Sequence, residues 1–362
     1  MSDSLVEALG LAVRANLPVL LWGSPGTGKT SAVLAMGRAM DLPVEVVVGS
    51  VREPSDFAGL PVVSEGSVHF APPRWADRLA SQGEGILFLD ELTTSPPAVQ
   101  AAMLRVVLER VVGDLQLPGG VRVVAAANRP QEAADGWELS APMANRFVHL
   151  DWTIEADEIG RGLTTGFPVP GSGRRVVEPT AAQSLAARTA VASFLHVRPA
   201  LVLQVPRTSS AAGRAWPSPR SWETVAHLLA VTEASSASPD ARLLLVSGAV
   251  GDGPALELLS WLSELDLPDP AAVLADPDGF SLPDRGDRAY AALTAVASYA
   301  VASSDAELWQ AAWRVIARAA EVAPDVAVLV ARSLAAHRPA GAPLPTEVQA
   351  LTPVLHAAGL LT

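Results

Sequence analysis

The feature that most constrains this chain is a glycine-rich segment close to its start. Residues 23–30 read Gly-Ser-Pro-Gly-Thr-Gly-Lys-Thr and fit the pattern G-x-x-x-x-G-K-[ST] at every position. A loop of this kind needs a buried strand that leads into it and a helix that begins at its end. The apolar run 17–22, interrupted by Pro18, predicts that strand, and residues 29–40 predict the helix. The segment therefore predicts an α/β fold that binds a nucleoside triphosphate.

Each residue type in the loop suits a triphosphate and its magnesium ion. Glycines let successive backbone N–H groups turn toward phosphate oxygens, a lysine adds a positive charge, and a threonine hydroxyl can ligate Mg²⁺. Lys29 is the only lysine in the chain, so every other residue among the 26 lysines and arginines is an arginine. The only ammonium side chain therefore lies in the glycine-rich loop, where a compact positive charge is required. We expect ATP and Mg²⁺ to be bound by Gly23, Ser24, Pro25, Gly26, Thr27, Gly28, Lys29 and Thr30.

Composition narrows the class of protein further. The 362 residues are enough for two or three domains, and the net charge of −12 argues against general attraction to nucleic acid, although a local basic groove stays possible. The absence of cysteine excludes disulfides and thiolate metal sites, and the 6 histidines show no ligand spacing, so we expect ordinary core or surface histidines. With no signal-peptide pattern and no apolar stretch long enough to span a bilayer, the sequence predicts a soluble cytoplasmic protein.

The pattern of elements changes near Asp151. Before it, helices and strands alternate as in a parallel sheet, with strands expected at 44–48, 86–89, 121–126 and 147–150, hairpins at 62–70 and 111–117, and a helix at 97–110. Residues 166–220 are rich in proline and in Gly/Ser clusters around a helix at 181–194. From residue 221 onward, Ala/Leu/Val-rich helical periodicity dominates, and Trp261, Trp309 and Trp313 are expected to be packing residues.

Polar side chains follow two of the expected strands. The strand 86–89 ends in Asp90 and Glu91, and the strand 121–126 is followed by Asn128. In P-loop ATPases an Asp at such a strand end serves the Mg²⁺ shell, and a Glu beside it polarises the attacking water. We therefore predict that Asp90 holds the metal, that Glu91 activates water, and that Asn128 reaches the γ-phosphate or the water.

Two arginines are candidates for contacts with phosphate. Arg146 closes a short expected helix just before the strand 147–150, where it could reach the nucleotide of a neighbouring subunit. Arg220 begins a later helix, with Ser218 or Ser221 available to cap it. Either arginine could instead be an ordinary surface cation.

In this order, the motifs resemble those of an AAA+ ATPase over roughly residues 1–235, and within that superfamily the likeness is greatest to the MoxR family. The MoxR resemblance is carried by an extra hairpin at 57–75, a second hairpin at 110–117, and the stretch 96–104 after Asp90 and Glu91. The chain departs from the MoxR pattern at 93–95, where Thr-Thr-Ser follows instead of Asn-Arg.

The resemblance implies a five-stranded parallel P-loop core with helices on both faces at 1–151, a helical lid at 152–265 and a helical extension at 266–362. It implies that Lys29 and Thr30 are the Walker A pair, Asp90 and Glu91 the Walker B pair, Asn128 sensor 1, Arg146 the arginine finger and Arg220 sensor 2. Whether Arg220 serves its own nucleotide or a neighbour's stays open. The segment 57–59 lies where AAA+ unfoldases place an aromatic pore loop.

The resemblance also implies a function: a ring, commonly hexameric, that hydrolyses ATP to remodel or mature a protein client with a von Willebrand A-domain partner. One alternative is a switch or scaffold that binds ATP and barely hydrolyses it. Another is a nucleic-acid-linked AAA+ motor, which the acidic balance disfavours. A small-molecule P-loop kinase is the remaining alternative, and it would leave the sensor and finger arginines without a role.

Overall fold

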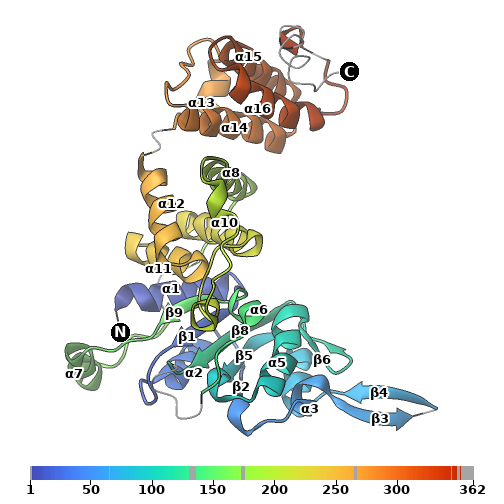
Figure 1. Cartoon of the computed structure of the whole chain (residues 1–362), viewed down its shortest axis with the longest axis vertical. Coiled ribbons are helices and arrows are strands. Elements are labelled where there is room, and N and C mark those ends of the chain that lie inside the picture. The colour runs from blue at the N-terminus through green and yellow to red at the C-terminus, as the bar shows by residue number, and fades with distance from the viewer. Residues whose placement is uncertain are drawn as a thin grey trace. The chain divides into compact units, whose positions relative to one another are not determined.

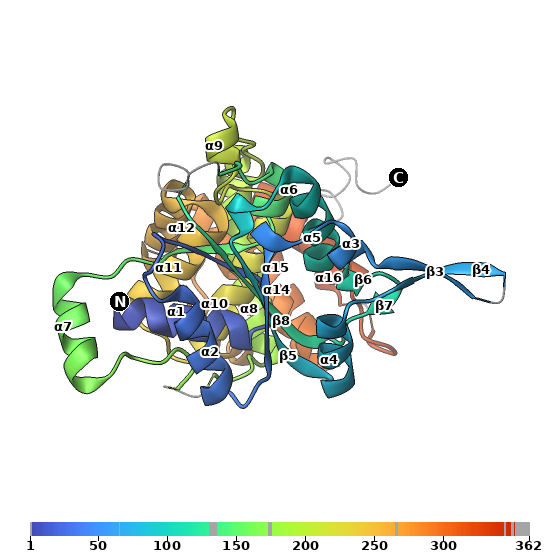
Figure 2. The same cartoon turned by 90° about the horizontal axis from the view of Figure 1, so that it is seen from below.

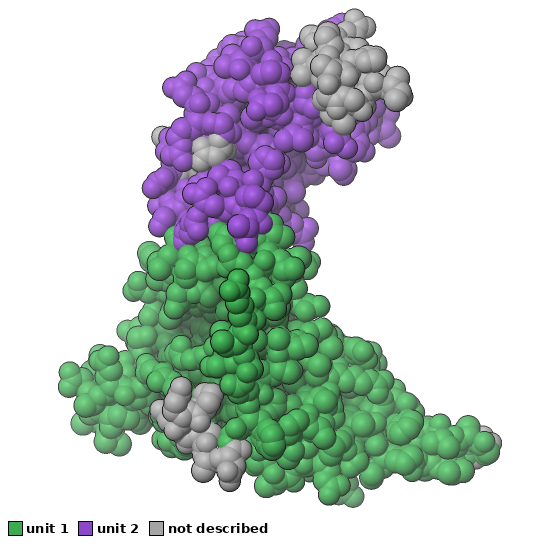
Figure 3. All heavy atoms as spheres, in the orientation of Figure 1, with its two compact units in different colours: residues 1–178, 201–256 green, residues 179–200, 257–362 purple. Residues whose placement is uncertain are grey.

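The computed structural model describes residues 2–64, 66–129, 136–172, 176–264, 267–343, 345–348 and 351. The chain divides into two compact units, one of residues 1–178 with 201–256 and one of residues 179–200 with 257–362 (Figure 3). Each unit combines two separate ranges of the chain, whereas the expected core, lid and extension are consecutive ranges. The boundaries of those three domains stay a prediction.

The first unit is built on a five-stranded sheet in the order β2-β5-β8-β1-β9, and all of its strand pairs are parallel (Figure 1). The strands are β1 (Val19–Trp22), β2 (Val44–Val48), β5 (Glu84–Asp90), β8 (Gly120–Ala127) and β9 (Val148–Asp151). The order places β1, which feeds the glycine-rich loop, between the strands that end near Asn128 and Asp151. The five-stranded parallel sheet expected from the sequence is confirmed.

Helices cover both faces of this sheet. Alternate strand residues such as Leu20, Leu87 and Val123 belong to one core with α4 (Arg74–Gln82) and α5 (Pro97–Glu109). The opposite face is in contact with α1 (Asp3–Arg14) and α2 (Lys29–Ala39), whose apolar side chains are buried. A sheet covered on both faces explains why its strands read as continuous apolar runs instead of alternating ones.

Two hairpins accompany the sheet, and the turn of the second lies against the base of the first. The pair β3 (Leu60–Ser64) and β4 (Ser67–Ala71) extends away from the sheet (Figure 2), and β6 (Val111–Val112) pairs with β7 (Leu115–Gln116). Asp114, in the turn of the second hairpin, accepts the Phe70 N–H at 2.6 Å and donates its own N–H to the Phe70 carbonyl at 3.0 Å. Both hairpins expected from the sequence are confirmed, and the first presents exposed apolar side chains such as Val63 and Val68.

Several short helices and single turns lie between the longer elements. They are α3 (Ser55–Ala58), α6 (Ala141–Ala144), α7 (Ala156–Thr165) and α9 (Ser209–Ala212), with single turns at Gly49–Val51, Leu92–Thr94 and Pro199–Leu201. Helix α7, at whose start Glu155 and Glu158 form a capping box, was not predicted from the sequence, and α9 lies in a region expected to be a connection.

The remaining helices complete the chain. In sequence order they are α8 (Ala181–Val197), α10 (Pro219–Ala234), α11 (Pro239–Val250), α12 (Asp252–Glu264), α13 (Pro270–Ala275), α14 (Gly286–Ser303), α15 (Ala306–Val322) and α16 (Pro324–Ala336). Trp309 and Trp313 are fully buried in the core of the second unit with ring centroids 5.8 Å apart, so they are packing residues as expected, and Trp261 is buried as well. Among the described helices, none is long and apolar enough to cross a membrane.

Candidate functional site

The glycine-rich loop is shaped by backbone demands that differ along its length. Gly26 and Gly28 adopt φ values of 78° and 82°, where a side chain would strain the backbone although nothing lies within 4 Å of an added Cβ. At Gly23 the limit is space, because a Cβ would lie 2.4 Å from the Trp152 carbonyl oxygen. The Trp152 indole in turn donates to the Thr27 carbonyl at 3.0 Å. The residue after β9 therefore supports the loop from one side.

The structure brings the predicted phosphate and metal residues together. Lys29 Nζ donates to the carbonyls of Gly23 at 2.6 Å and Ser24 at 3.0 Å and lies 3.4 Å from Asn128 Oδ1. The Thr30 hydroxyl donates to Asp90 Oδ2 at 2.7 Å. A cleft of about 350 Å³ is lined by Pro25–Ser31 together with Asp90, Glu91 and Asn128. Their convergence follows from the parallel sheet, whose carboxyl strand ends meet at one edge.

A hydrogen bond from Ser50, a residue not predicted from the sequence, restricts the rotation of the Glu91 side chain. The Ser50 hydroxyl donates to Glu91 Oε2, and the Glu91 backbone, at φ 58°, donates its N–H to Asp90 Oδ1 at 2.9 Å. Ser50 lies just beyond the carboxyl end of β2, so the rule that placed Asp90 and Asn128 at this edge could also have found it.

An apolar cavity continues from the loop on the other side of the start of α2. It measures about 460 Å³ and shares Gly26, Thr27, Gly28 and Ser31 with the polar cleft. Its walls are mainly apolar, formed by Ala32, Ala35, Trp152, Ile154, Ile159, Phe167, Pro168 and Val169, with Arg38 at its edge. The site thus joins a phosphate-sized polar cleft to a pocket suited to an aromatic base.

Arg146 lies at the opposite edge of the sheet from the glycine-rich loop. Because β1 and β9 are parallel, with Val19 beside Val148 and Trp22 beside Asp151, Gly23 follows one end while Arg146 precedes the other. The strands between them span about 13 Å, at roughly 3.3 Å per residue. Arg146 is therefore not part of the cleft that its own chain forms.

Arg220 lies close to Arg146 instead of close to the cleft. Burial first, and then the positive charge of Arg220, lower the pKa of Arg146 from its ordinary value. Arg146 Nη1 donates to the Pro142 carbonyl at 2.5 Å, and Arg220 is exposed at the start of α10. Within the described part of the chain, neither arginine forms an ion pair with a carboxylate. The roles of the predicted site residues remain predictions. The structure places the residues of the glycine-rich loop, Asp90, Glu91 and Asn128 around one cleft, and Arg146 with Arg220 away from it.

The core behind the loop contains a buried histidine with a defined tautomer. Trp22 Nε1, which can only donate, lies 2.8 Å from His149 Nδ1, so the proton of the imidazole is on Nε2, 2.8 Å from the Ala144 carbonyl. Burial above all, with Arg214 as a further cause, lowers the pKa of His149 to about 4, although the bond to the Ala144 carbonyl opposes this. His149 is thus a neutral core residue, as expected for the histidines.

Stability is expected to fall as the pH drops from 7 to 5. The unfolded chain protonates His149 near pH 6.5 but the folded chain only near pH 4, so between these values protons favour the unfolded state. The loss should be about 2 kcal/mol between pH 7 and pH 5. Chemical denaturation of the wild type and of His149→Phe at both pH values isolates this contribution, since the variant should lack it. An equal pH dependence in both proteins would show that His149 is not its source.

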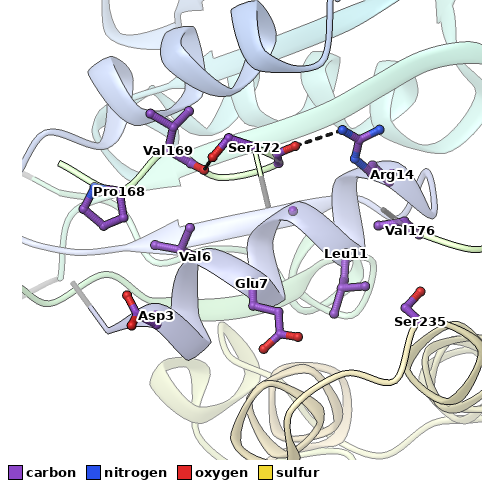
Figure 4. Close-up of a pocket in the computed structure, with 12 residues that line it drawn as sticks. Asp3, Val6, Glu7, Leu11, Arg14, Pro168, Val169, Ser172, Val176 and Ser235 are labelled. Atoms are coloured by element: carbon purple, nitrogen blue, oxygen red, sulfur yellow. Dashed lines mark hydrogen bonds between the residues drawn. The ribbon is translucent and has the colours of Figure 1, made fainter. Parts of the chain in front are cut away.

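A further cavity of about 360 Å³ lies between α1 and a wall that includes Pro168, Val169 and Ser172 (Figure 4). Arg14 closes one end by donating to the Gly171 carbonyl at 2.9 Å, and Asp3 and Glu7 line the other side. Glu7 is already engaged, since it accepts from the Ser238 hydroxyl at 2.5 Å. No residue of the phosphate loop lines this cavity, so we do not assign it to the nucleotide.

The position of Phe57 does not support an aromatic pore loop at 57–59. Phe57 is only 1% exposed and packs against Trp75, with ring centroids 6.1 Å apart. Because the side chain is part of the sheet's core, it is unavailable to contact another molecule.

Comparison with known proteins supports nucleotide binding by the N-terminal part of the chain. Residues 1–137 match the family model of the Sigma-54 interaction domain, an AAA+ ATPase-type domain. The matched range contains the loop, Asp90, Glu91 and Asn128 and ends before Arg146. An AAA+ ATPase-type domain implies nucleotide binding.

Three curated relatives each match about a third of this chain. The regulatory protein WtsA of Pantoea stewartii is 28% identical over 135 residues, which are 35% of this chain and 42% of that protein. A Nif-specific regulatory protein of Rhizobium etli is 33% identical over 140 residues, or 36% and 24%. The ATPase family gene 2 protein homolog B of Rattus norvegicus is 36% identical over 137 residues, or 35% and 17%. The chain spans less than half the length of each.

The solved structures that resemble this chain are distant. A Cytophaga hutchinsonii protein assigned as an ATPase matches with a TM-score of 0.45 and 17% identity over 72% of this chain and 88% of its own. A full-length MCM homolog from Methanopyrus kandleri matches with a TM-score of 0.41 and 16% identity over 67% and 55%. Likenesses at this level add nothing to the site.

Proposed function

We propose that this protein is the ATP-hydrolysing subunit of an AAA+ ring, in which each active site is completed by the neighbouring subunit. One observation carries the proposal: Lys29, Thr30, Asp90, Glu91 and Asn128 line one cleft, whereas Arg146 lies at the opposite edge of the sheet. The residues that line this cleft include candidates for holding a metal and for activating water, but no arginine. A second copy of the chain could supply that arginine.

The residues present fit ATP with Mg²⁺. The left-handed glycines leave the loop backbone open toward the cleft, and Lys29 is already drawn into the loop by two carbonyls. Mg²⁺ in such sites takes one or two protein oxygens besides phosphate oxygens and water. Thr30 and Asp90, joined by a hydrogen bond of 2.7 Å, would supply them. The ion would neutralise charge on the phosphates when bound.

Glu91 and Asn128 would act on the water that attacks the γ-phosphate. Glu91, at the end of β5, would polarise this water once its carboxylate is released from the Ser50 hydroxyl. Asn128 lies 3.4 Å from Lys29 Nζ and can contact the same phosphate. In this scheme, the hydrogen bond from Ser50 holds the base in a resting orientation.

The apolar cavity beside the loop would bind the adenine. We expect Ile154→Asp to raise KM for ATP about tenfold with kcat unchanged, because a carboxylate replaces an apolar wall away from the reacting phosphate. Steady-state phosphate release at varied ATP measures both constants. Leu163→Asp is the matched control, since this exposed side chain on α7 lines none of the cavities described. A KM that rises equally in both variants would refute the base site.

Turnover would serve to remodel or mature a protein client, with a von Willebrand A-domain protein as partner. The MoxR-like hairpins, both present in the structure, support this part of the proposal. The match to the Sigma-54 interaction domain and to regulatory proteins keeps a nucleic-acid-linked role as the alternative. A salt-dependent DNA-binding titration separates the two, because a protein with a net charge of −12 should bind DNA only through a local basic surface.

The proposal is tested by the rate of phosphate release per subunit across a protein dilution series. A site shared between subunits loses activity on dilution, since the ring dissociates. A rate per subunit that is independent of concentration, in a protein shown by sedimentation to be monomeric, would contradict the shared site. ATP binding without any turnover would favour the switch.

A further inference from the structure

Arg146 is tied to the helix that begins with Arg220 by a buried side chain between them. Asn145, which is 7% exposed, accepts a hydrogen bond from the Ser218 hydroxyl at 2.6 Å and donates from Nδ2 to the Trp216 carbonyl at 3.0 Å. Both the oxygen and the nitrogen of the Asn145 side-chain amide are thus bound to the short segment 216–218, which lies about seventy residues further along the chain.

Ser218 is also the N-cap of α10, so the contact fixes the start of that helix. Its hydroxyl accepts the Ser221 N–H at 3.1 Å while donating to Asn145, and the Ser221 hydroxyl donates to the Trp216 carbonyl at 3.0 Å. A hydroxyl that accepts from the helix and donates to Asn145 cannot rotate without losing one of the two bonds. The helix start and the residue before Arg146 therefore move together.

This connection holds two like charges near one another. Burial and the charge of Arg220 lower the pKa of Arg146, so the two guanidinium groups repel each other in the resting protein. In the described residues no carboxylate pairs with either of them. Repulsion between two cations is relieved by an anion placed between them, and a triphosphate of a neighbouring copy is such an anion.

We propose that Asn145 is a positioning residue which, through Ser218, sets Arg146 and Arg220 as a pair that contacts the same nucleotide of the neighbouring subunit. This inference rests on the proposed function and resolves one point left open by the sequence. Arg220 acts on the neighbour's nucleotide together with Arg146, because the bridge keeps it at the edge of the sheet opposite its own cleft.

The test is subunit mixing with Asn145→Ala. Alone, this variant should have a kcat about tenfold below that of the wild type with unchanged KM for ATP, because the arginines are displaced while the subunit's own cleft is intact. Glu91→Gln subunits should be inactive but keep both arginines. Mixing them with Asn145→Ala subunits should restore turnover, because some Asn145→Ala clefts then face an intact arginine pair.

Ser218→Ala, which breaks the same bridge from the other side, is the second variant and should behave in the same way. Thr232→Ala is the matched control, since its buried hydroxyl donates to the Leu229 carbonyl within α10, and it should change neither kcat nor the result of mixing. A mixture of Arg146→Ala with Glu91→Gln is the positive control. Folding of each variant is checked by thermal unfolding.

The outcomes separate this inference from the proposed function. Restored turnover with both Asn145→Ala and Arg146→Ala supports the bridge. Restoration with Arg146→Ala alone, or full activity of Asn145→Ala by itself, overturns the bridge and leaves the shared site standing. No restoration with either variant overturns the shared site and the bridge with it.

Discussion

Replacing Arg146 by alanine is expected to lower kcat for ATP by about 10³-fold, while the altered subunit binds ATP as tightly as before. An arginine supplied from outside the cleft stabilises charge that develops on the γ-phosphate in the transition state, and contributions of about 10³-fold or more are typical. ATP binding should persist because Lys29, Thr30 and the apolar cavity lie at the other edge of the sheet.

Single-turnover kinetics and binding of a fluorescent ATP analogue measure the two quantities separately. Arg105→Ala is the control, since Arg105 is an exposed arginine of the same unit that pairs with Glu109 four residues later. A variant that loses ATP binding together with turnover would place Arg146 in its own cleft, contrary to the strand register. A variant with wild-type turnover would mean that another residue completes the site.

The second large effect is expected for Glu91→Gln, which should lower kcat by about 10²-fold to 10³-fold with ATP binding retained. The amide keeps the size of the carboxylate but cannot accept a proton from water, and general-base catalysis contributes about 10²-fold to 10⁴-fold. Asp90 and Thr30, which would hold the metal, keep their hydrogen bond in this variant. The result decides between an enzyme and a nucleotide-dependent switch.

Phosphate release under saturating ATP measures this effect, and filter binding of labelled ATP checks that the cleft is intact. Glu109→Gln, an exposed carboxylate at the end of α5, serves as the control. Unchanged turnover in Glu91→Gln would show that the water is activated elsewhere. If the biological function survives a complete loss of turnover, the result favours a nucleotide-dependent switch over an ATP-hydrolysing enzyme.

Several parts of the fold were predictable because each depends on local sequence. The strand, loop and helix over residues 17–40 follow from an apolar run, three glycines and a helical pattern, and the structure has β1 and α2 there. Ser218 was predicted as one of two possible caps because serine preceded a Pro-Arg helix start, and it caps α10. The helix α7 was missed because its N-cap is Glu155, which is not one of the Ser, Thr, Asp or Asn residues that mark a helix start in sequence.

The sequence by itself indicated which groups could do chemistry, because residue type and position place Lys29 and Thr30 in the glycine-rich loop and Asp90, Glu91 and Asn128 just after expected parallel strands. It placed Arg146 before another strand but could not decide where Arg220 belongs, because that depends on contacts between segments more than seventy residues apart. Strand register puts Arg146 at the far edge, and the hydrogen bond from Ser218 to Asn145 brings Arg220 to it. Such contacts depend on three-dimensional packing, which local patterns of residue type do not encode.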